Sequence, residues 1–159
     1  MDSFEPDGLR VFVYGTLMPG GRYHREYCGH YLTNAIPAAV QGQLYDFPQM
    51  GYPAMTAGHD WVKGYLLEFC QSAATCEDIL RRLDALEGYV SDAVTADGDY
   101  QRRHRQIFTP EYEPLQMAWV YQMSAEQVRQ QGGVYLPGGD WRSRLSARSA
   151  DNGADTEAS

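Results

Sequence analysis

Five short runs of residues rich in β-branched and aromatic side chains constrain the fold of this chain more than any other feature. The segments between them carry Pro, Gly and Asp, and this combination is typical of β-strands separated by turns. The runs cover residues 9–14, 39–47, 61–70, 105–109 and 115–123. We therefore predict a protein that is built mainly from strands.

A helix is expected between the third and fourth runs, over residues 76–87. Thr75 would be its N-cap and Asp78, three residues further on, the capping-box partner. Gly88 is expected to stop the helix, because glycine adopts the backbone conformation that commonly follows a last helical turn.

A second, shorter helix is expected to begin at Ser124, with Gln127 as its box partner, and to end before the glycines at 132–133. Residues 22–31 are polar, so they favour at most one or two helical turns. The sequence therefore predicts few helices beside the strands.

The length of 159 residues fits one domain, with 43% hydrophobic and 21% charged residues as in an ordinary globular protein. We expect this domain to cover residues 9–145. Residues 1–8 are expected to form a flexible N-terminus, and residues 146–159, which are small and polar without periodicity, a disordered tail.

The formal net charge of -8 opposes sequence-independent binding to nucleic acid or to anionic lipid. No apolar run approaches the roughly 18 residues that cross a bilayer, and the acidic N-terminus lacks a hydrophobic signal core. Three cysteines without a C-x-x-C pair are expected to be buried thiols. We expect a cytoplasmic protein that binds a small molecule.

A carboxylate lies on the apolar side of the predicted helix. The apolar stripe of this helix consists of Ile79, Leu80, Leu83 and Leu86. At about 100° per residue, Glu87 falls within the same stripe. Burial and the partial negative charge of a helix C-terminus both raise the pKa of such a carboxyl, which suits a general base. Periodicity alone leaves an equal alternative, in which Glu87 frays into solvent or pairs with Arg103.

The first strand-like run ends at a glycine-bounded loop, residues 15–21 (GTLMPGG). Such a loop can present consecutive backbone N–H groups to a carboxylate or another oxyanion, although a glycine loop after a strand is often only a turn. It has neither the lysine of a phosphate-binding P-loop nor the G-x-G-x-x-G dinucleotide pattern. Phosphate or nucleotide binding is therefore disfavoured.

Other chemistries have little support in the sequence. His24, Cys28 and His30 lie close together, but their spacing matches no established zinc pattern, so no metal site is expected. The G-x-S-x-G elbow of serine hydrolases is absent, and no cysteine carries a local nucleophile signature.

Seven short motifs, taken in their order along the chain, resemble the γ-glutamylcyclotransferase superfamily, including its γ-glutamylamine-specific and antibiotic-biosynthetic branches. The most specific signal is Y-G-T-L followed at the right distance by L-D-x-L-E-G-Y. The motifs are Tyr14-Gly15-Thr16-Leu17, Gly42-Gln43-Leu44-Tyr45, Gly51-Tyr52-Pro53-Ala54-Met55, Val62-Lys63-Gly64-Tyr65, Leu83-Asp84-Ala85-Leu86-Glu87-Gly88-Tyr89, Tyr100-Gln101-Arg102-Arg103 and Ala118-Trp119-Val120-Tyr121. The resemblance covers residues 11–121.

The resemblance implies an α+β fold, with a small mixed, barrel-like sheet and packed helices. It implies that the backbone of Tyr14, Gly15, Thr16 and Leu17 binds the γ-glutamyl group. Glu87 would be the proton acceptor, and Tyr100 and Tyr121 would line or support the substrate site. Either Arg102 or Arg103 would fill the place of a basic residue that follows Tyr100 in the family.

The activity implied is cyclisation of a small γ-glutamyl amine, amide or peptide to 5-oxoproline, with release of the free amine. The substrate's own α-amine is the nucleophile, so no metal or cofactor is expected. The protein would be a monomer or a homodimer. A non-catalytic small-molecule binding protein on the same fold is the alternative, although a pure binder would have no need of a carboxylate as costly as that of Glu87.

Overall fold

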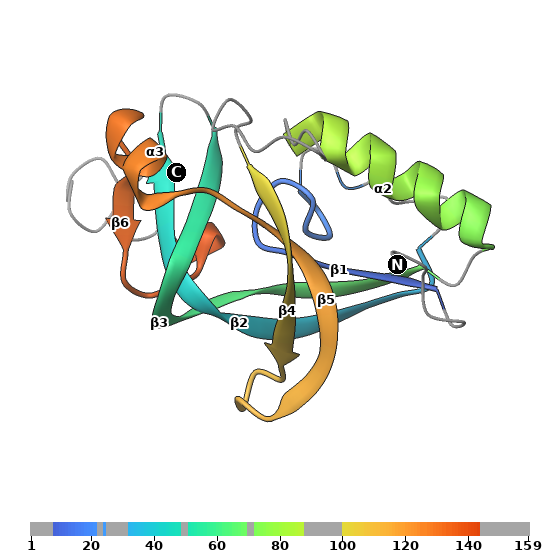
Figure 1. Ribbon diagram of the computed structural model, residues 1–159. Helices are drawn as coiled ribbons and strands as arrows, with labels where there is room; N and C mark the ends of the chain where they lie inside the picture. Colours follow the sequence, from blue (N-terminus) through green and yellow to red (C-terminus); the bar gives the residue numbers. More distant parts are fainter. Residues whose placement is uncertain are drawn as a thin grey trace.

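The computed structural model describes residues 8–21, 24, 32–48, 51–69, 72–87 and 100–143, and at positions 73, 86 and 87 it describes the backbone alone. Six strands and two α-helices lie in these ranges (Figure 1). In chain order the elements are β1 (Leu9–Val13), β2 (Asn34–Phe47), β3 (Tyr52–Phe69), α2 (Ala73–Glu87), β4 (Gln101–Phe108), β5 (Pro114–Gln122), α3 (Ala125–Gln130), β6 (Val134–Leu136) and the short 3-10 helix η1 (Trp141–Ser143).

The strands form one mixed sheet that closes on itself. Their order is β3-β1-β5-β4-β2-β6, and β2 also pairs with β3, which joins the first five strands into a barrel. β1 and β5 run parallel, with Val11 opposite Trp119, whereas the other paired strands are antiparallel. The predicted α+β fold with a barrel-like mixed sheet is therefore confirmed.

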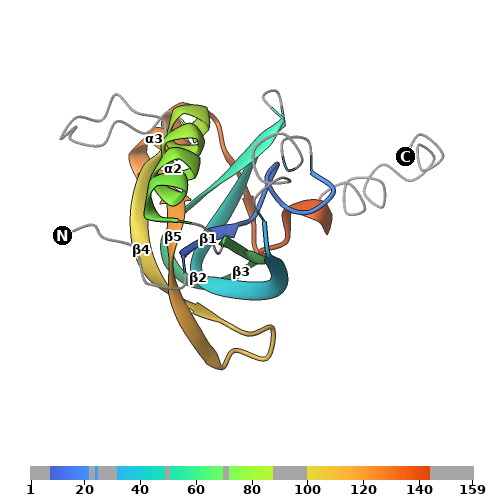
Figure 2. The same cartoon turned by 90° about the vertical axis from the view of Figure 1, so that its right-hand side faces the viewer.

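One face of α2 packs on the barrel. Figures 1 and 2 show this helix lying across the barrel beside β1 and β5. The buried side chains of α2 are Cys76, Ile79, Leu80 and Leu83, which recur at the spacing of one helical face and belong to the main hydrophobic core. The apolar stripe predicted from periodicity is thus the packed face of the helix at every position whose side chain is described.

The two central strands are longer than the sequence predicts. β2 begins at Asn34 and β3 at Tyr52, because residues 34–47 and 52–69 pair along most of their length as one antiparallel hairpin. Pro37, Pro53 and Gly58 weaken the strand signal in these segments. The cross-strand pairing outweighs that local disfavour, and the register shifts between Gln41 and Gln43, where residues 57–60 of β3 have no partner on β2.

The other predicted boundaries differ less. β1 and β5 begin and end within one residue of their predicted limits, whereas β4 begins at Gln101, four residues before the predicted 105. β6 (Val134–Leu136) was not predicted, because its strand signal is only three residues long. It pairs with the outer edge of β2.

The start of α2 corrects one prediction. The helix begins at Ala73, and its N-cap is Ser72 rather than Thr75: the N–H of Thr75 donates to Ser72 Oγ at 3.2 Å, and the N–H of Cys76 to the Ser72 carbonyl at 2.9 Å. Two alanines of high helix propensity allow the earlier start. Because Thr75 is not the N-cap, Asp78 is not the capping-box partner either. Gly88 lies outside the described residues.

The second helix has the predicted N-cap and ends before the glycines at 132–133. Ser124 is the N-cap of α3, and its side chain accepts the N–H of Gln127 at 3.1 Å. The predicted turns of residues 22–31 lie outside the described residues except at His24, and the predicted termini lie outside them except at Gly8. None of the helices in the described ranges combines the length and the hydrophobicity of a membrane span.

Gly64 lets β3 approach β1 closely. A Cβ atom at position 64 would lie 2.9 Å from Phe12 Cζ and closer still to the carbonyl oxygen of Val13, so no larger residue fits without movement of the backbone. Val13 directly precedes Tyr14 and the glycine loop. The small residue in the V-K-G-Y motif therefore sets where this loop leaves the barrel.

We expect Gly64→Ala to lower the free energy of unfolding by about 1–3 kcal/mol, because the methyl group would overlap backbone atoms of β1. Urea denaturation measures this change. Gly138→Ala is the matched control, since a Cβ atom there meets no atom within 4 Å. Equal stability of the two variants would contradict the close approach.

Candidate active site

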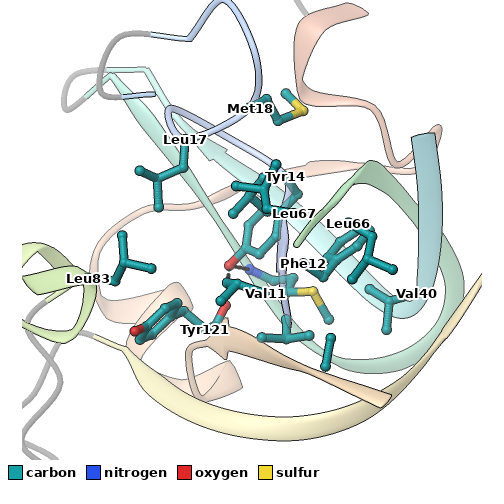
Figure 3. Packing of buried hydrophobic residues seen from close by; sticks show 14 of the residues in the cluster. Val11, Phe12, Tyr14, Leu17, Met18, Val40, Leu66, Leu67, Leu83 and Tyr121 are labelled. Atoms are coloured by element: carbon teal, nitrogen blue, oxygen red, sulfur yellow. Dashed lines mark hydrogen bonds between the residues drawn. The ribbon is translucent and has the colours of Figure 1, made fainter. Parts of the chain in front are cut away.

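The loop after β1 is a compact turn whose apolar side chains point into the core. The N–H of Met18 donates to the Gly15 carbonyl at 3.0 Å, and that of Gly21 to the Met18 carbonyl at 2.6 Å. Leu17 and Met18 are both buried. Figure 3 shows Leu17, together with Leu83 and Tyr121, gathered around the hydroxyl end of Tyr14.

Three consecutive N–H groups of this loop remain as donors. Within the described ranges, no protein group accepts a hydrogen bond from the backbone of Gly15, Thr16 or Leu17. Consecutive backbone N–H groups of this kind form a concavity that suits a carboxylate or a developing oxyanion. The loop thus has the donors that the sequence hypothesis requires of it.

The loop rests on the start of β3. A Cβ atom at position 15 would lie 2.7 Å from the ring of Pro53, so glycine permits this contact. The hydroxyl of Tyr100 donates to the Pro53 carbonyl at 2.5 Å and is buried. Tyr100, a predicted site residue, therefore lies behind the segment that supports Gly15.

Tyr14 joins the loop to two other strands. Its hydroxyl donates to the carbonyl oxygen of Tyr121 on β5 at 2.5 Å and accepts the N–H of Met55 on β3 at 3.2 Å. The side chain is buried, so both bonds are shielded from water. The hydroxyl of Tyr14 is therefore engaged with protein groups.

Tyr121 continues this connection to α2. Its hydroxyl donates to Asp84 Oδ1 at 2.5 Å, and Arg102 Nη1 of β4 lies 3.2 Å from Asp84 Oδ2. The guanidinium of Arg102 also stacks over the ring of Trp119, 4.7 Å from its centroid. Of the two arginines considered for this place, Arg102 turns towards α2, whereas Arg103 is exposed and contacts Gln101.

The surroundings of Asp84 change the pKa of its carboxyl group. Burial raises its pKa above the usual value, whereas the hydrogen bond from Tyr121 and the charge of Arg102 act in the opposite direction. A partly buried carboxylate with two such partners is a structural anchor for the helix that carries it. The sequence analysis assigned no role to Asp84, which lies three residues before Glu87 in the L-D-x-L-E-G-Y motif.

Glu87 is the last residue of α2, and its side chain lies outside the described part of the chain. At about 100° per residue, helix geometry places position 87 between Leu83 and Asp84 around the helix axis. Leu83 packs in the core and Asp84 contacts β4 and β5. The role of Glu87 and its alternative pairing with Arg103 stay predictions.

The weak metal hypothesis falls mostly outside the described ranges, which include His24 but not Cys28 or His30. His24 Nδ1 lies 2.8 Å from the carbonyl oxygen of Leu17, so this ring helps to hold the glycine loop. Cys76 is a buried thiol, as predicted, and its Sγ lies 3.8 Å from the Phe69 carbonyl.

A closed mixed barrel, with a glycine loop after its first strand and an anchored helix beside it, defines the structural class. The sequence model described as gamma-glutamyl cyclotransferase, AIG2-like, matches residues 11–143. The chain belongs to this family.

Solved structures support the same fold. An AIG2-like protein from mouse has 21% identity and a TM-score of 0.60, with 86% of this chain and 89% of that one covered. YkqA from Bacillus subtilis has 19% identity and a TM-score of 0.60, with 89% of this chain matched but only 42% of YkqA. An uncharacterized protein from Pyrococcus horikoshii has 19% identity and a TM-score of 0.54, with 89% and 97% covered. Comparison with curated proteins gives no match.

We expect Tyr14→Phe to lower the free energy of unfolding by about 1–3 kcal/mol, because it removes a buried hydroxyl that serves Tyr121 and Met55. Thermal and urea denaturation measure the loss. Tyr65→Phe is the control, since the Tyr65 hydroxyl makes no hydrogen bond within the described ranges. A loss for Tyr14→Phe no larger than that for the control would refute the bridging role.

Proposed function

We propose that this protein is a γ-glutamylcyclotransferase, which converts a small γ-glutamyl amine, amide or peptide to 5-oxoproline and releases the free amine. Membership of the family supports this reaction class. The observation that carries the proposal is the convergence of the glycine loop and the last turns of α2, which are joined through Tyr14, Tyr121 and Asp84.

The reaction needs no nucleophile from the protein. The α-amine of the γ-glutamyl group attacks the γ-carbonyl carbon, a C–N bond forms and closes a five-membered lactam, and the bond to the leaving nitrogen breaks. One proton leaves the attacking nitrogen and one is gained by the departing nitrogen. A single carboxyl group that accepts and then donates a proton serves both steps. We assign this role to Glu87.

The glycine loop would position the substrate. The N–H groups of Gly15, Thr16 and Leu17 would bind the substrate carboxylate, or the oxyanion that develops on the γ-carbonyl oxygen. Because the attack is intramolecular, the main task of the protein is to hold the amine and the carbonyl in a reactive arrangement. A loop that begins next to the hydrogen-bonded Tyr14 and rests on Pro53 suits that task.

The tyrosines of the site have a structural role, because their hydroxyl groups bind other protein groups. The hydroxyls of Tyr14, Tyr100 and Tyr121 donate to a carbonyl oxygen or a carboxylate of the protein at 2.5 Å in each case. They are therefore poorly suited to donate a proton to the leaving group. We infer that they fix the walls of the site and leave proton transfer to Glu87.

The direct test incubates the protein with a panel of γ-glutamyl amides and dipeptides and assays 5-oxoproline. Glu87→Gln is expected to lower kcat by about 10²–10⁴-fold, because the amide can neither accept nor donate the proton in transfer. Glu77→Gln, at an exposed position near the start of the same helix, is the matched control and should retain activity.

Two results would contradict the proposal. Full turnover by Glu87→Gln would remove the assigned acid/base residue. The absence of 5-oxoproline from every member of the panel, with binding of γ-glutamyl compounds retained, would instead indicate a binding protein on this fold.

A further inference from the structure

Asp84 is a charged residue of the site that the proposed reaction does not use. Its side chain is only 16% exposed and that of Arg102 is 14% exposed, so their ion pair is largely shielded from water. Such a pair costs free energy to desolvate, and its contribution to overall stability is therefore small. The ion pair does, however, fix the orientation of the Asp84 side chain relative to β4.

The contacts of Asp84 come from two different strands. Tyr121 of β5 donates to Oδ1 at 2.5 Å, and Arg102 of β4 reaches Oδ2 from 3.2 Å. Because each carboxylate oxygen has its own partner, the side chain is held at two points. Rotation of α2 about its axis would break both contacts together.

The same turn of the helix is held on its other side by the core. Leu83 is fully buried and packs in the cluster that contains Leu17 and Tyr121 (Figure 3). At about 100° per residue, position 87 lies about 40° from Leu83 and about 60° from Asp84 around the axis. It thus falls between an apolar anchor and a polar anchor, one turn further along.

The anchor also reaches the glycine loop. Tyr121 donates its hydroxyl to Asp84 and accepts the hydroxyl of Tyr14 at its carbonyl oxygen. Tyr14 directly precedes Gly15, whose N–H group is one of the proposed substrate donors. One residue of β5 therefore links the helix that carries the proposed base to the loop that would hold the substrate.

We propose that Asp84 is a positioning residue, which fixes the rotation of the last turn of α2 and thereby aims position 87 at the loop of residues 15–17. This inference rests on the proposed function. A displacement of about 1 Å between a base and its substrate can cost about 10²-fold in rate. Loss of the anchor should therefore lower kcat while the loop still binds substrate.

The kinetic test compares Asp84→Asn, Tyr121→Phe and the double variant in the 5-oxoproline assay. Each single variant is expected to lower kcat by about 10–100-fold and to leave KM within about twofold. The double variant should lose little more than the worse single one, because Asp84 and Tyr121 belong to one anchor of the helix, which either change weakens. Asp78→Asn, an exposed partner of Arg81 on the same helix, is the matched control and should keep the wild-type kcat.

A second measurement does not depend on turnover. Amide hydrogen exchange should become faster in Asp84→Asn over residues 84–87, while residues 76–80 keep their wild-type protection. Equal loss of protection along the whole helix would mark general destabilisation and overturn the proposal. Unchanged exchange over residues 84–87 would also overturn it.

The two proposals fail in different ways. An active wild type with an unimpaired Asp84→Asn variant would overturn the positioning role and leave the proposed function standing. A wild type that forms no 5-oxoproline would overturn the proposed function and, with it, any catalytic role for Asp84. In that case, faster exchange confined to residues 84–87 would still show that Asp84 anchors the turn.

Discussion

The hydroxyl group of Tyr14 is the interaction on which the rest of the structure depends. It lies at the end of β1, accepts the N–H of Met55 on β3 and donates to the Tyr121 carbonyl on β5, the two strands that flank β1 in the barrel. A buried hydroxyl with a partner on each side resists displacement, because either unpaired group would carry a desolvation cost. The chain leaves the barrel at a fixed point, and the glycine loop starts there.

Close backbone approach is the second constraint. Gly64 lets β3 contact the end of β1, and Gly15 lets the loop rest on Pro53, which Tyr100 holds from behind. These contacts leave the N–H groups of residues 15–17 as the donors of the loop. With α2 anchored through Asp84 to β4 and β5, the barrel presents a donor loop and a helix end in a fixed relation. The proposed intramolecular cyclisation would need such a fixed relation between substrate donors and a base.

The sequence predicts the parts of this arrangement whose signals are local. The apolar run of β1, the stripe on α2 and the cap of α3 at Ser124 each depend on neighbours within a few residues. The length of β2 and β3 does not, because long-range pairing overrides the local effect of proline and glycine. The contacts of Asp84 with Tyr121 and Arg102 likewise join distant parts of the chain and follow only from the closed barrel. Helix periodicity places Glu87 on the apolar stripe but leaves a frayed end as an equal alternative. The resemblance of its motif to a family favours the role of a proton acceptor.

We propose that the loop after β1 binds the γ-glutamyl group through its backbone. A titration of the ¹⁵N-labelled protein with 5-oxoproline, the proposed product, tests it most directly by NMR. We expect the amide resonances of Gly15, Thr16 and Leu17 to shift together with one saturating dependence on ligand concentration, while those of the helix α3 stay in place. Saturable shifts confined to other parts of the barrel would contradict this proposal. The absence of any shift at the highest ligand concentration tested would contradict it as well.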